Sequence, residues 1–245
     1  MSGVLYLIPT PLGEGGEMAA VLPESVRNIA LSLNSFVAEN PKTARQFLKR
    51  LGITRPLQDI QMTTLDEHTP PEQVGQLLAP LLAGHDVGLV SEAGCPAVAD
   101  PGALLVRAAH EKGVKVVPLV GPSSILLALM ASGMNGQSFT FHGYLPANRE
   151  ERVKRLGELD KESRACRQTQ IFIETPYRNQ QMFEDILRAC PSQTLLCVAT
   201  DITQANERIE TRTLAEWKGK VPDLHKRPTI FLIYSGAIAA RKPRK

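Results

Sequence analysis

Residues 87–102 read VGLVSEAGCPAVADPG, and this stretch decides the fold that the sequence predicts. It opens with an apolar run, Val87–Val90, of the kind found in a parallel strand that is buried on both faces. A loop around Gly94-Cys95-Pro96 follows, and Asp100-Pro101 then predicts the capped start of a helix that ends at Gly113. A strand that enters a helix through a loop of small residues is the repeating unit of α/β folds.

The same unit repeats on both sides of this stretch, so the first half of the chain predicts a mostly parallel sheet with helices on both faces. The predicted strands are Val4–Ile8, Ser35–Ala38, Val87–Val90 and Val114–Leu119, the last of them a buried strand. The first predicted helix is Pro23–Leu33, and the second is capped by Asn40 and stops at Gly52. The third opens with a capping box at Thr69 and buries an apolar stripe formed by Val74, Leu77, Leu78 and Leu81. The fourth is the helix after Asp100.

In the second half strands follow one another more often, which favours a mixed sheet. The predicted strands are Phe139–Phe141, Gln170–Ile173, Leu195–Ala199, Arg208–Thr211 and Thr229–Tyr234, and the predicted helices are Ser123–Ala131, a charged and exposed helix at Asn148–Leu159, and Gln180–Ala189. We therefore expect an α/β protein of two α/β domains, at residues 1–119 and 120–236, followed by a basic tail at residues 237–245.

The composition of the 245 residues, 43% hydrophobic and 22% charged, is that of a soluble globular protein. No apolar run approaches the ~20 residues of a membrane helix, and the first residues predict a strand rather than a signal peptide, so we expect a cytoplasmic protein. The net charge is +3, but the tail Arg241–Lys245 carries +4, which leaves about −1 on the rest. The charge therefore does not by itself indicate a nucleic-acid partner.

The four cysteines, Cys95, Cys166, Cys190 and Cys197, form no CxxC pair and no metal-ligand spacing with the five histidines. We expect reduced, buried thiols and no metal site. Cys95 raises a second question, because it lies in a loop and a nucleophilic cysteine is one interpretation. Its nearest charges in sequence, Glu92 and Asp100, would raise the pKa of the thiol, so a loop that acts through its backbone is the favoured interpretation.

Three loops leave the carboxyl ends of predicted parallel strands, where such sheets bind ligands. They are Pro9–Gly16, Ser91–Asp100 and Val120–Ser124, and all are rich in Gly, Pro and small hydroxyl residues. Strand-to-helix turns need Gly and Pro for structural reasons alone, but three such loops at one edge favour a binding cleft. No GxGxxG fingerprint and no GxxxxGK[ST] phosphate loop is present, which argues against ordinary NAD-binding and P-loop proteins.

The stretches LYLIPTPLG, VGLVSEAGCPAVADPG, VKVVPLVGPSS and GYLP, in this order, resemble the tetrapyrrole methylase superfamily, the class III S-adenosylmethionine-dependent methyltransferases. Within it, the chain most resembles the ribosomal RNA small subunit methyltransferase I-like branch. The resemblance implies a homodimer of two α/β domains with S-adenosylmethionine in the cleft between them. The cofactor-binding positions that it implies are Ala93, Gly94, Cys95, Val98, Ser123, Ser124, Glu174 and Ile202.

The sequence departs from that branch on the substrate side. The RNA-modifying members have Glu-Asp-Thr-Arg where this chain has Glu39-Asn40-Pro41-Lys42-Thr43, and Glu-Ser-Thr-His-Arg where it has residues 174–178, ETPYR. Their first loop continues Gly-Asn-Leu rather than Gly-Glu-Gly-Gly, and near the last strand they have Lys-Gly-Glu rather than Lys226-Arg227-Pro228. The cofactor side of the resemblance is intact, whereas the substrate side is altered.

The resemblance implies an S-adenosylmethionine-dependent methyltransferase that acts on RNA. A methyltransferase for a tetrapyrrole or another small molecule remains an alternative, as does a non-catalytic member that binds cofactor or RNA. A ribose hydroxyl acceptor needs a base, for which Glu39 and His68 are the candidates. The pattern itself favours a structural interpretation of each, Glu39 as a charge partner of a helix N-terminus and His68 as a solvated loop residue. Substrate contacts are expected from Pro9, Thr10, Pro11, Lys42 and Arg178, and Arg149 is a further cation for carboxylates or phosphates.

Overall fold

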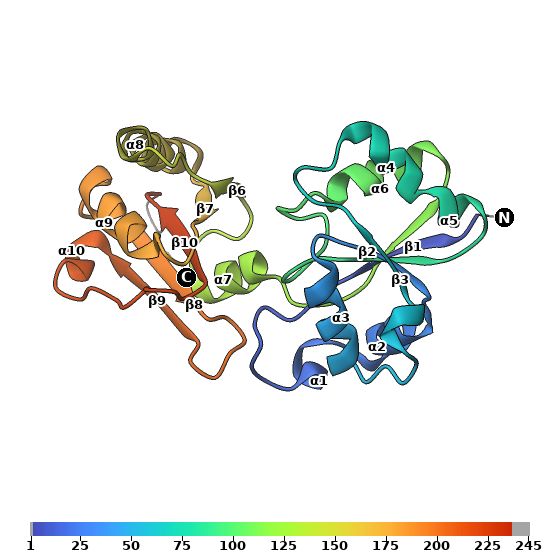
Figure 1. Ribbon diagram of the computed structural model, residues 1–245. Helices are drawn as coiled ribbons and strands as arrows, with labels where there is room; N and C mark the ends of the chain where they lie inside the picture. Colours follow the sequence, from blue (N-terminus) through green and yellow to red (C-terminus); the bar gives the residue numbers. More distant parts are fainter. Residues whose placement is uncertain (1, 237–245) are drawn as a thin grey trace, which may run out of the picture. The chain divides into compact units, whose positions relative to one another are not determined.

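The computed structural model describes residues 2–236. These residues form two compact units, and the chain passes from the first to the second between Ser123 and Ser124. Both units are α/β structures, as the sequence predicts, and each has its own five-stranded sheet (Figure 1).

The first unit has a parallel sheet with the strand order β3-β2-β4-β1-β5. The strands are β1 (Val4–Ile8), β2 (Ser35–Ala38), β3 (Gln61–Thr64), β4 (Val87–Val90) and β5 (Lys115–Pro118). The helices are α1 (Met18–Val21), α2 (Glu24–Ser32), α3 (Pro41–Arg50), α4 (Pro71–Leu77), α5 (Ala79–Leu82) and α6 (Gly102–Glu111), with one 3-10 turn, η1 (Leu57–Asp59).

Helices cover both faces of this sheet (Figure 1). One apolar core joins β1 and β4 to α4, α5 and α6 through side chains that include Leu5, Leu81 and Leu105. The second core joins the opposite face to α1, α2 and α3, with Ile8 and Phe36 among its members. The central strands β2 and β4 are buried along their whole length, which explains their continuous apolar sequences.

Two edge strands differ from the prediction. β3 was not predicted, because its sequence, QMTT, is polar and mostly exposed at the edge of the sheet. β5 was predicted as a buried strand, but it is the other edge strand, and its end residues Lys115 and Pro118 are exposed. An edge strand has a neighbour on one side only, so its sequence is under weaker apolar selection than that of a central strand.

The predicted capping box at Thr69 is also wrong. Pro70 is the N-cap of α4 and makes no side-chain cap. The hydroxyl of Thr69 instead donates to Asp66 Oδ1 at 2.9 Å, closing a local turn that competes with capping. The apolar stripe is confirmed, since Val74, Leu77, Leu78 and Leu81 are buried, although it is divided between α4 and α5.

The second unit has a mixed sheet, as predicted, with the order β6-β7-β10-β8-β9. β6 and β7 are parallel, and the other pairs are antiparallel. The strands are β6 (Phe139–Tyr144), β7 (Thr169–Ile173), β8 (Leu195–Thr200), β9 (Arg208–Thr213) and β10 (Thr229–Tyr234). The helices are α7 (Ser124–Ser132), α8 (Arg149–Cys166), α9 (Asn179–Ala189) and α10 (Leu214–Trp217).

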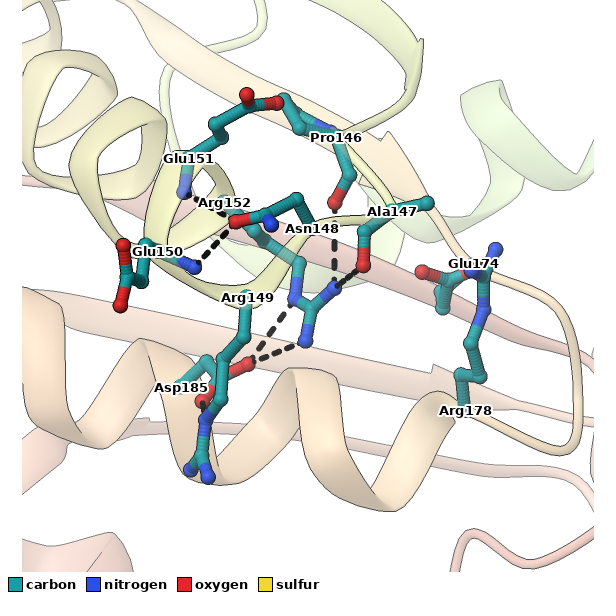
Figure 2. A network of polar contacts seen from close by, with 10 residues as sticks. All are labelled: Pro146, Ala147, Asn148, Arg149, Glu150, Glu151, Arg152, Glu174, Arg178 and Asp185. Carbon is teal, nitrogen blue, oxygen red and sulfur yellow. Dashed lines mark hydrogen bonds and ion pairs between the residues drawn. The ribbon is translucent and has the colours of Figure 1, made fainter.

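α8 is longer and more buried than the exposed helix that the sequence predicts. It continues to Cys166 and buries five residues, Arg152, Leu156, Leu159, Asp160 and Ser163. Arg152 lies against the equally buried Asp185 of α9, with its Nη2 2.7 Å from Asp185 Oδ2, and donates to the carbonyls of Pro146 and Ala147 (Figure 2). Charged residues are thus part of this core because their partners neutralise them.

The four cysteines are free thiols, as expected, but they are not all buried. Cys190 and Cys197 are buried, Cys95 is partly buried and Cys166 is exposed. Burial, together with the charge of Asp160, raises the pKa of Cys190 to about 12. Within residues 2–236, every helix is too short or too polar to cross a membrane. The basic tail Arg241–Lys245 lies outside the described residues.

Candidate functional site

The three predicted loops of the first unit come together at one edge of the sheet. They follow β1, β4 and β5, which are neighbouring strands, so parallel pairing carries their ends to the same side. Thr10 and Gly94 form a β-bridge with two hydrogen bonds, from Thr10 N to Gly94 O at 2.9 Å and from Gly94 N to Thr10 O at 3.1 Å. The third loop joins them, because Pro122 O accepts a contact from Cys95 Sγ at 3.5 Å.

Glycine is required where these loops approach one another. Gly94 has φ +77°, and a Cβ there would lie 3.2 Å from Leu12 Cδ2 and 3.5 Å from Pro122 O. At Gly121 a Cβ would lie 2.2 Å from Pro9 Cγ. These two glycines therefore allow the backbones of the three loops to stand close together.

The loop after β4 also holds two strained residues that sequence reasoning missed. Ala97 and Ala99 have φ +65° and +60°, values that alanine rarely adopts. Asp100 fixes this conformation, since its Oδ1 accepts from the N–H groups of Ala97 and Gly102, each at 2.8 Å. The predicted side-chain cap at the start of α6 is not formed, because Pro101 is the N-cap and Asp100, one residue earlier, closes the turn that enters the helix. Backbone strain concentrated in one loop is common at ligand-binding sites.

Cys95 fits the structural interpretation better than the nucleophilic one. The thiol is partly buried, and burial raises its pKa above the ordinary value. The sequence predicts the same direction from Glu92 and Asp100, but the cause in the structure is desolvation. A thiol that resists ionisation is a poor nucleophile. Its neighbours Ala93 and Val98 are exposed on the same loop.

Glu39 follows β2 at the same edge of the sheet. Burial raises the pKa of its carboxyl, and the negative charges of Glu92, Asp100, Glu67 and Asp66 raise it further. His68 lies in the turn after β3, where its side chain is 84% exposed and its Nε2 is 3.6 Å from Glu67 Oε1. The structure therefore places Glu39 among the loops of the edge, whereas His68 faces solvent.

The candidate substrate residues of the first unit divide by exposure. Pro9 and Thr10 are buried at the contact between the loops, and the Thr10 hydroxyl donates to Ser91 O at 3.3 Å. Pro11 is partly exposed, and Lys42 is exposed in the first turn of α3. Asn40 caps that helix through a bond from Lys42 N at 2.9 Å, as the sequence predicts.

In the second unit, Glu174 follows β7, and its carboxylate is inaccessible to solvent. Its Oε1 accepts from Arg178 Nη2 at 2.7 Å and from Thr175 N at 2.6 Å. Figure 2 shows Arg178 beside Glu174. Its Oε2 is buried with no hydrogen-bond partner among the described residues. An acceptor left unpaired in this way costs about 1–3 kcal/mol, so a bound donor would stabilise it.

The remaining candidate positions flank strand ends. Ile202 is buried in the turn after β8, between Asp201 and Thr203, which both have positive φ. Asp201 Oδ2 accepts from Arg227 Nε at 2.6 Å, which ties this turn to the segment before β10. Ser123 and Ser124 are partly buried where the chain passes from one unit to the other.

A cavity of about 460 Å³ opens at the opposite, amino-terminal edge of the first sheet. Its lining includes Ser35, Gln61 and Asp86, which begin or precede β2, β3 and β4. None of the predicted site residues lines it. Over residues 2–236, no cluster of three or more His, Cys, Asp or Glu side chains is arranged to hold a metal ion.

Comparisons with known proteins identify a family and several relatives that this chain resembles. Residues 4–218 match the family described as Tetrapyrrole (Corrin/Porphyrin) Methylases. The chain is 31% identical over 234 residues to the ribosomal RNA small subunit methyltransferase I of Vibrio cholerae, covering 94% of this chain and 77% of that protein. It is 34% identical over 232 residues to the protein of the same name from Xylella fastidiosa, covering 94% and 80%.

Two solved structures show the same fold. The methyltransferase CobJ has a TM-score of 0.61 at 20% identity, covering 96% of this chain and 94% of that one. The cobalt precorrin-4 methyltransferase CbiF has a TM-score of 0.59 at 16% identity, covering 94% of both. The motif order, the two α/β units and these matches lead to one conclusion. The chain belongs to the tetrapyrrole methylase family of methyltransferases.

Proposed function

We propose that this protein is an S-adenosylmethionine-dependent methyltransferase that acts on RNA of the small ribosomal subunit. The relatives named for that activity are 31% and 34% identical and cover 94% of the chain, which supports both the reaction and the substrate. The structural observation that carries the proposal is the contact of the three loops at Thr10, Gly94 and Pro122.

The residues present fit the cofactor. Gly94 lets the loops after β1, β4 and β5 pack together at the carboxyl edge of the sheet, and Glu174 Oε2 is a buried acceptor with no hydrogen-bond partner among the described residues. S-adenosylmethionine would supply an activated methyl group, whose transfer needs alignment more than chemical assistance. We assign its binding to Ala93, Gly94, Cys95, Val98, Ser123, Ser124, Glu174 and Ile202.

Glu39 is the group that we propose as the base for a ribose hydroxyl. Its raised pKa brings the carboxyl closer to the pH at which a base works efficiently. His68 is the weaker candidate because its side chain is exposed. Pro9, Thr10, Pro11, Lys42 and Arg178 are the proposed substrate residues.

A second candidate function is methylation of a tetrapyrrole or another small molecule. The folds of CobJ and CbiF support it, since both are methyltransferases of this architecture. A macrocycle carbon is itself electron-rich, so this reaction depends less on a base such as Glu39. A family member that binds cofactor or RNA without turnover is the third candidate.

One experiment separates the three. The protein is incubated with methyl-labelled S-adenosylmethionine and, in parallel, with undermodified small ribosomal subunits, total RNA and porphyrinogens. We expect label in the small-subunit RNA. Label in a porphyrinogen alone supports the second candidate, and label in neither supports the third. Calorimetry with the cofactor checks its binding independently.

We also propose a cytoplasmic homodimer, which rests on the resemblance to the family. Light scattering after size-exclusion chromatography tests the dimer, for which we expect twice the 26.8 kDa chain mass. A single species at the chain mass would overturn this part of the proposal.

A further inference from the structure

An exposed aromatic ring stands in the loop between β7 and α9. Tyr177 is 72% exposed, more than any other aromatic residue named among the exposed large hydrophobic side chains. The ammonium group of Lys226 lies 5.8 Å from the centroid of its ring, and the ring of His225 meets it edge-on at 6.5 Å. We call Tyr177, His225 and Lys226 the aromatic–basic cluster.

Hydrogen bonds hold together the two backbone segments that carry this cluster. Lys226 N donates to Pro176 O at 3.1 Å, which joins the two segments directly. Asn179 Nδ2, two residues after Tyr177, donates to the carbonyl of Arg227, one residue after Lys226, at 2.6 Å. Since both segments are anchored, Tyr177 is held open to solvent without the entropy cost of ordering a mobile loop.

The segment that carries Lys226 is strained and rich in basic residues. Lys226 has φ +59°, an unfavourable conformation for lysine that the surrounding bonds maintain. Arg178, next to Tyr177, is fixed on the buried Glu174. The sequence from residue 218 to 227 is rich in basic side chains against a single acidic one, Asp223: it contains Lys218, Lys220, His225, Lys226 and Arg227. Arg227 is paired with Asp201, so Lys226 and His225, which contact the ring, are the groups that suit it to an anionic partner.

We propose that the aromatic–basic cluster is a stacking platform for an unpaired nucleobase of an RNA strand, with Lys226 and His225 directed to the neighbouring phosphates. Single-stranded RNA is bound in this way, by bases stacked on aromatic rings and phosphates held by basic side chains. This inference rests on the proposed RNA substrate and deepens it. The cluster governs affinity for the strand, whereas the loop after β4, with Ala93, Gly94, Cys95 and Val98, is assigned to the cofactor.

The first test is binding of a fluorescein-labelled oligoadenylate RNA of twelve nucleotides, followed by anisotropy. Replacing Tyr177 with Leu removes the π-face and should weaken binding about 5- to 150-fold, the range for loss of one stacked base. Tyr177→Phe keeps the ring and should bind within about twofold of wild type. The matched control is Phe139→Leu, which changes an exposed aromatic at the opposite end of the β6–β7 pair and should have no effect.

The role of Lys226 is tested by salt dependence. Lys226→Gln should lower the slope of log affinity against log salt concentration by about 0.7, the value for one phosphate contact on a single strand. Lys161→Gln, at an exposed position on α8, is the matched control and should leave the slope unchanged.

Stacking has its own spectroscopic signature. A 2-aminopurine placed in the same oligonucleotide should lose emission when wild-type protein or Tyr177→Phe binds, and should keep it with Tyr177→Leu at saturating protein. In methyl transfer, Tyr177→Leu should raise KM for RNA and leave kcat and cofactor affinity unchanged. Because Tyr177 is exposed, its replacement should change the melting temperature little.

The outcomes separate this inference from the proposed function. If wild type methylates RNA and Tyr177→Leu binds RNA as well as wild type does, the platform is refuted and the proposed function stands. If wild type transfers no methyl group to RNA and does not bind the oligonucleotide, both fail. If instead a porphyrinogen is methylated and Tyr177→Leu raises its KM, the cluster serves a small molecule and the RNA assignment is overturned.

Discussion

Cys95 is the most reactive residue type in its loop, yet the residue before it does more to shape the site. Gly94 pairs with Thr10 and adopts a left-handed conformation, and a Cβ added to it would lie 3.5 Å from Pro122 O in the loop after β5. Cys95 contributes a partly buried thiol whose pKa is raised by burial. At the scale of single residues, backbone conformation therefore matters more than side-chain chemistry in this loop.

Replacing Gly94 with Val should abolish cofactor binding, with a loss in affinity of more than about tenfold. The branched side chain strains the positive φ and fills the space between Leu12 and Pro122. Gly113→Val is the matched control, because Gly113 has φ +67° but nothing within 4 Å of its Cβ. Calorimetry with S-adenosylmethionine should show that only the Gly94 variant loses binding; equal affinities would refute the role of this glycine.

Cys95→Ser should retain methyl transfer within about twofold. Serine is close in size and keeps the contact to Pro122 O, and the proposed reaction needs no thiol. Initial rates at saturating cofactor measure this. Loss of activity in a variant that still binds cofactor would restore the nucleophilic interpretation of Cys95.

Glu39 provides a prediction about pH. A base acts as the carboxylate, so a raised pKa moves the acidic limb of the kcat profile to higher pH. Glu92→Gln removes a negative charge that raises this pKa, and should move the limb to lower pH by less than about one unit. Glu111→Gln on α6 is the control and should leave the profile unchanged.

Glu39→Gln itself should lower kcat by about 10²- to 10⁴-fold while cofactor binding is retained. A kcat within twofold of wild type for Glu39→Gln, or an acidic limb that does not move in Glu92→Gln, would exclude Glu39 as the base.

At the scale of elements, one buried ion pair joins α8 to α9. Arg152 donates to both Asp185 and the carbonyls that precede α8, so it also fixes the turn at Pro146 and Ala147 (Figure 2). Arg149 reaches the other oxygen of Asp185 at 2.8 Å, but its side chain is 48% exposed. The two arginines share a partner and differ in burial.

Asp185→Ala should lower the free energy of unfolding by about 3–5 kcal/mol, because it leaves the charge of Arg152 buried and unpaired. Arg149→Ala should lower it by less than about 1 kcal/mol, since water screens this exposed pair. Urea denaturation of each variant measures the difference. Similar small losses for both would mean that the burial of Arg152 is not maintained by Asp185.

The sequence predicts best those strands and loops whose structure depends on residues within the same segment. Apolar runs identified β1, β2 and β4, and small residues identified the three loops that follow β1, β4 and β5. The polar edge strand β3 carries no such run and was missed. The length of α8 was underestimated because Arg152 and Asp160 look like surface residues until their distant partners Asp185 and Thr194 are known.

In the candidate site, too, features that depend on residues distant in the sequence could not be predicted. Glu39 could be identified from its place after a strand and Glu174 from the family resemblance, but the pKa shift of Glu39 and the unpaired oxygen of Glu174 arise from tertiary packing. The positive φ angles of Ala97 and Ala99 leave no mark in the sequence, since alanine is not selected for them. The aromatic–basic cluster joins residues almost fifty positions apart, and no sequence motif predicts it.

At the scale of the whole molecule, the two units carry different parts of the proposed activity. The first unit offers the loops around Gly94 and the base Glu39, and the second offers Glu174 and the aromatic–basic cluster. Membership of the tetrapyrrole methylase family accounts for the reaction, and the relatives that share about a third of the sequence indicate the RNA substrate.

The most direct test of this account is methyl transfer to undermodified small ribosomal subunits. With methyl-labelled S-adenosylmethionine, wild-type protein should place label in the small-subunit RNA, and Gly94→Val should place none. Gly113→Val should label the RNA as wild type does. Wild-type protein that binds the cofactor but leaves the RNA unlabelled, while a porphyrinogen in the parallel reaction acquires the methyl group, would contradict the central claim.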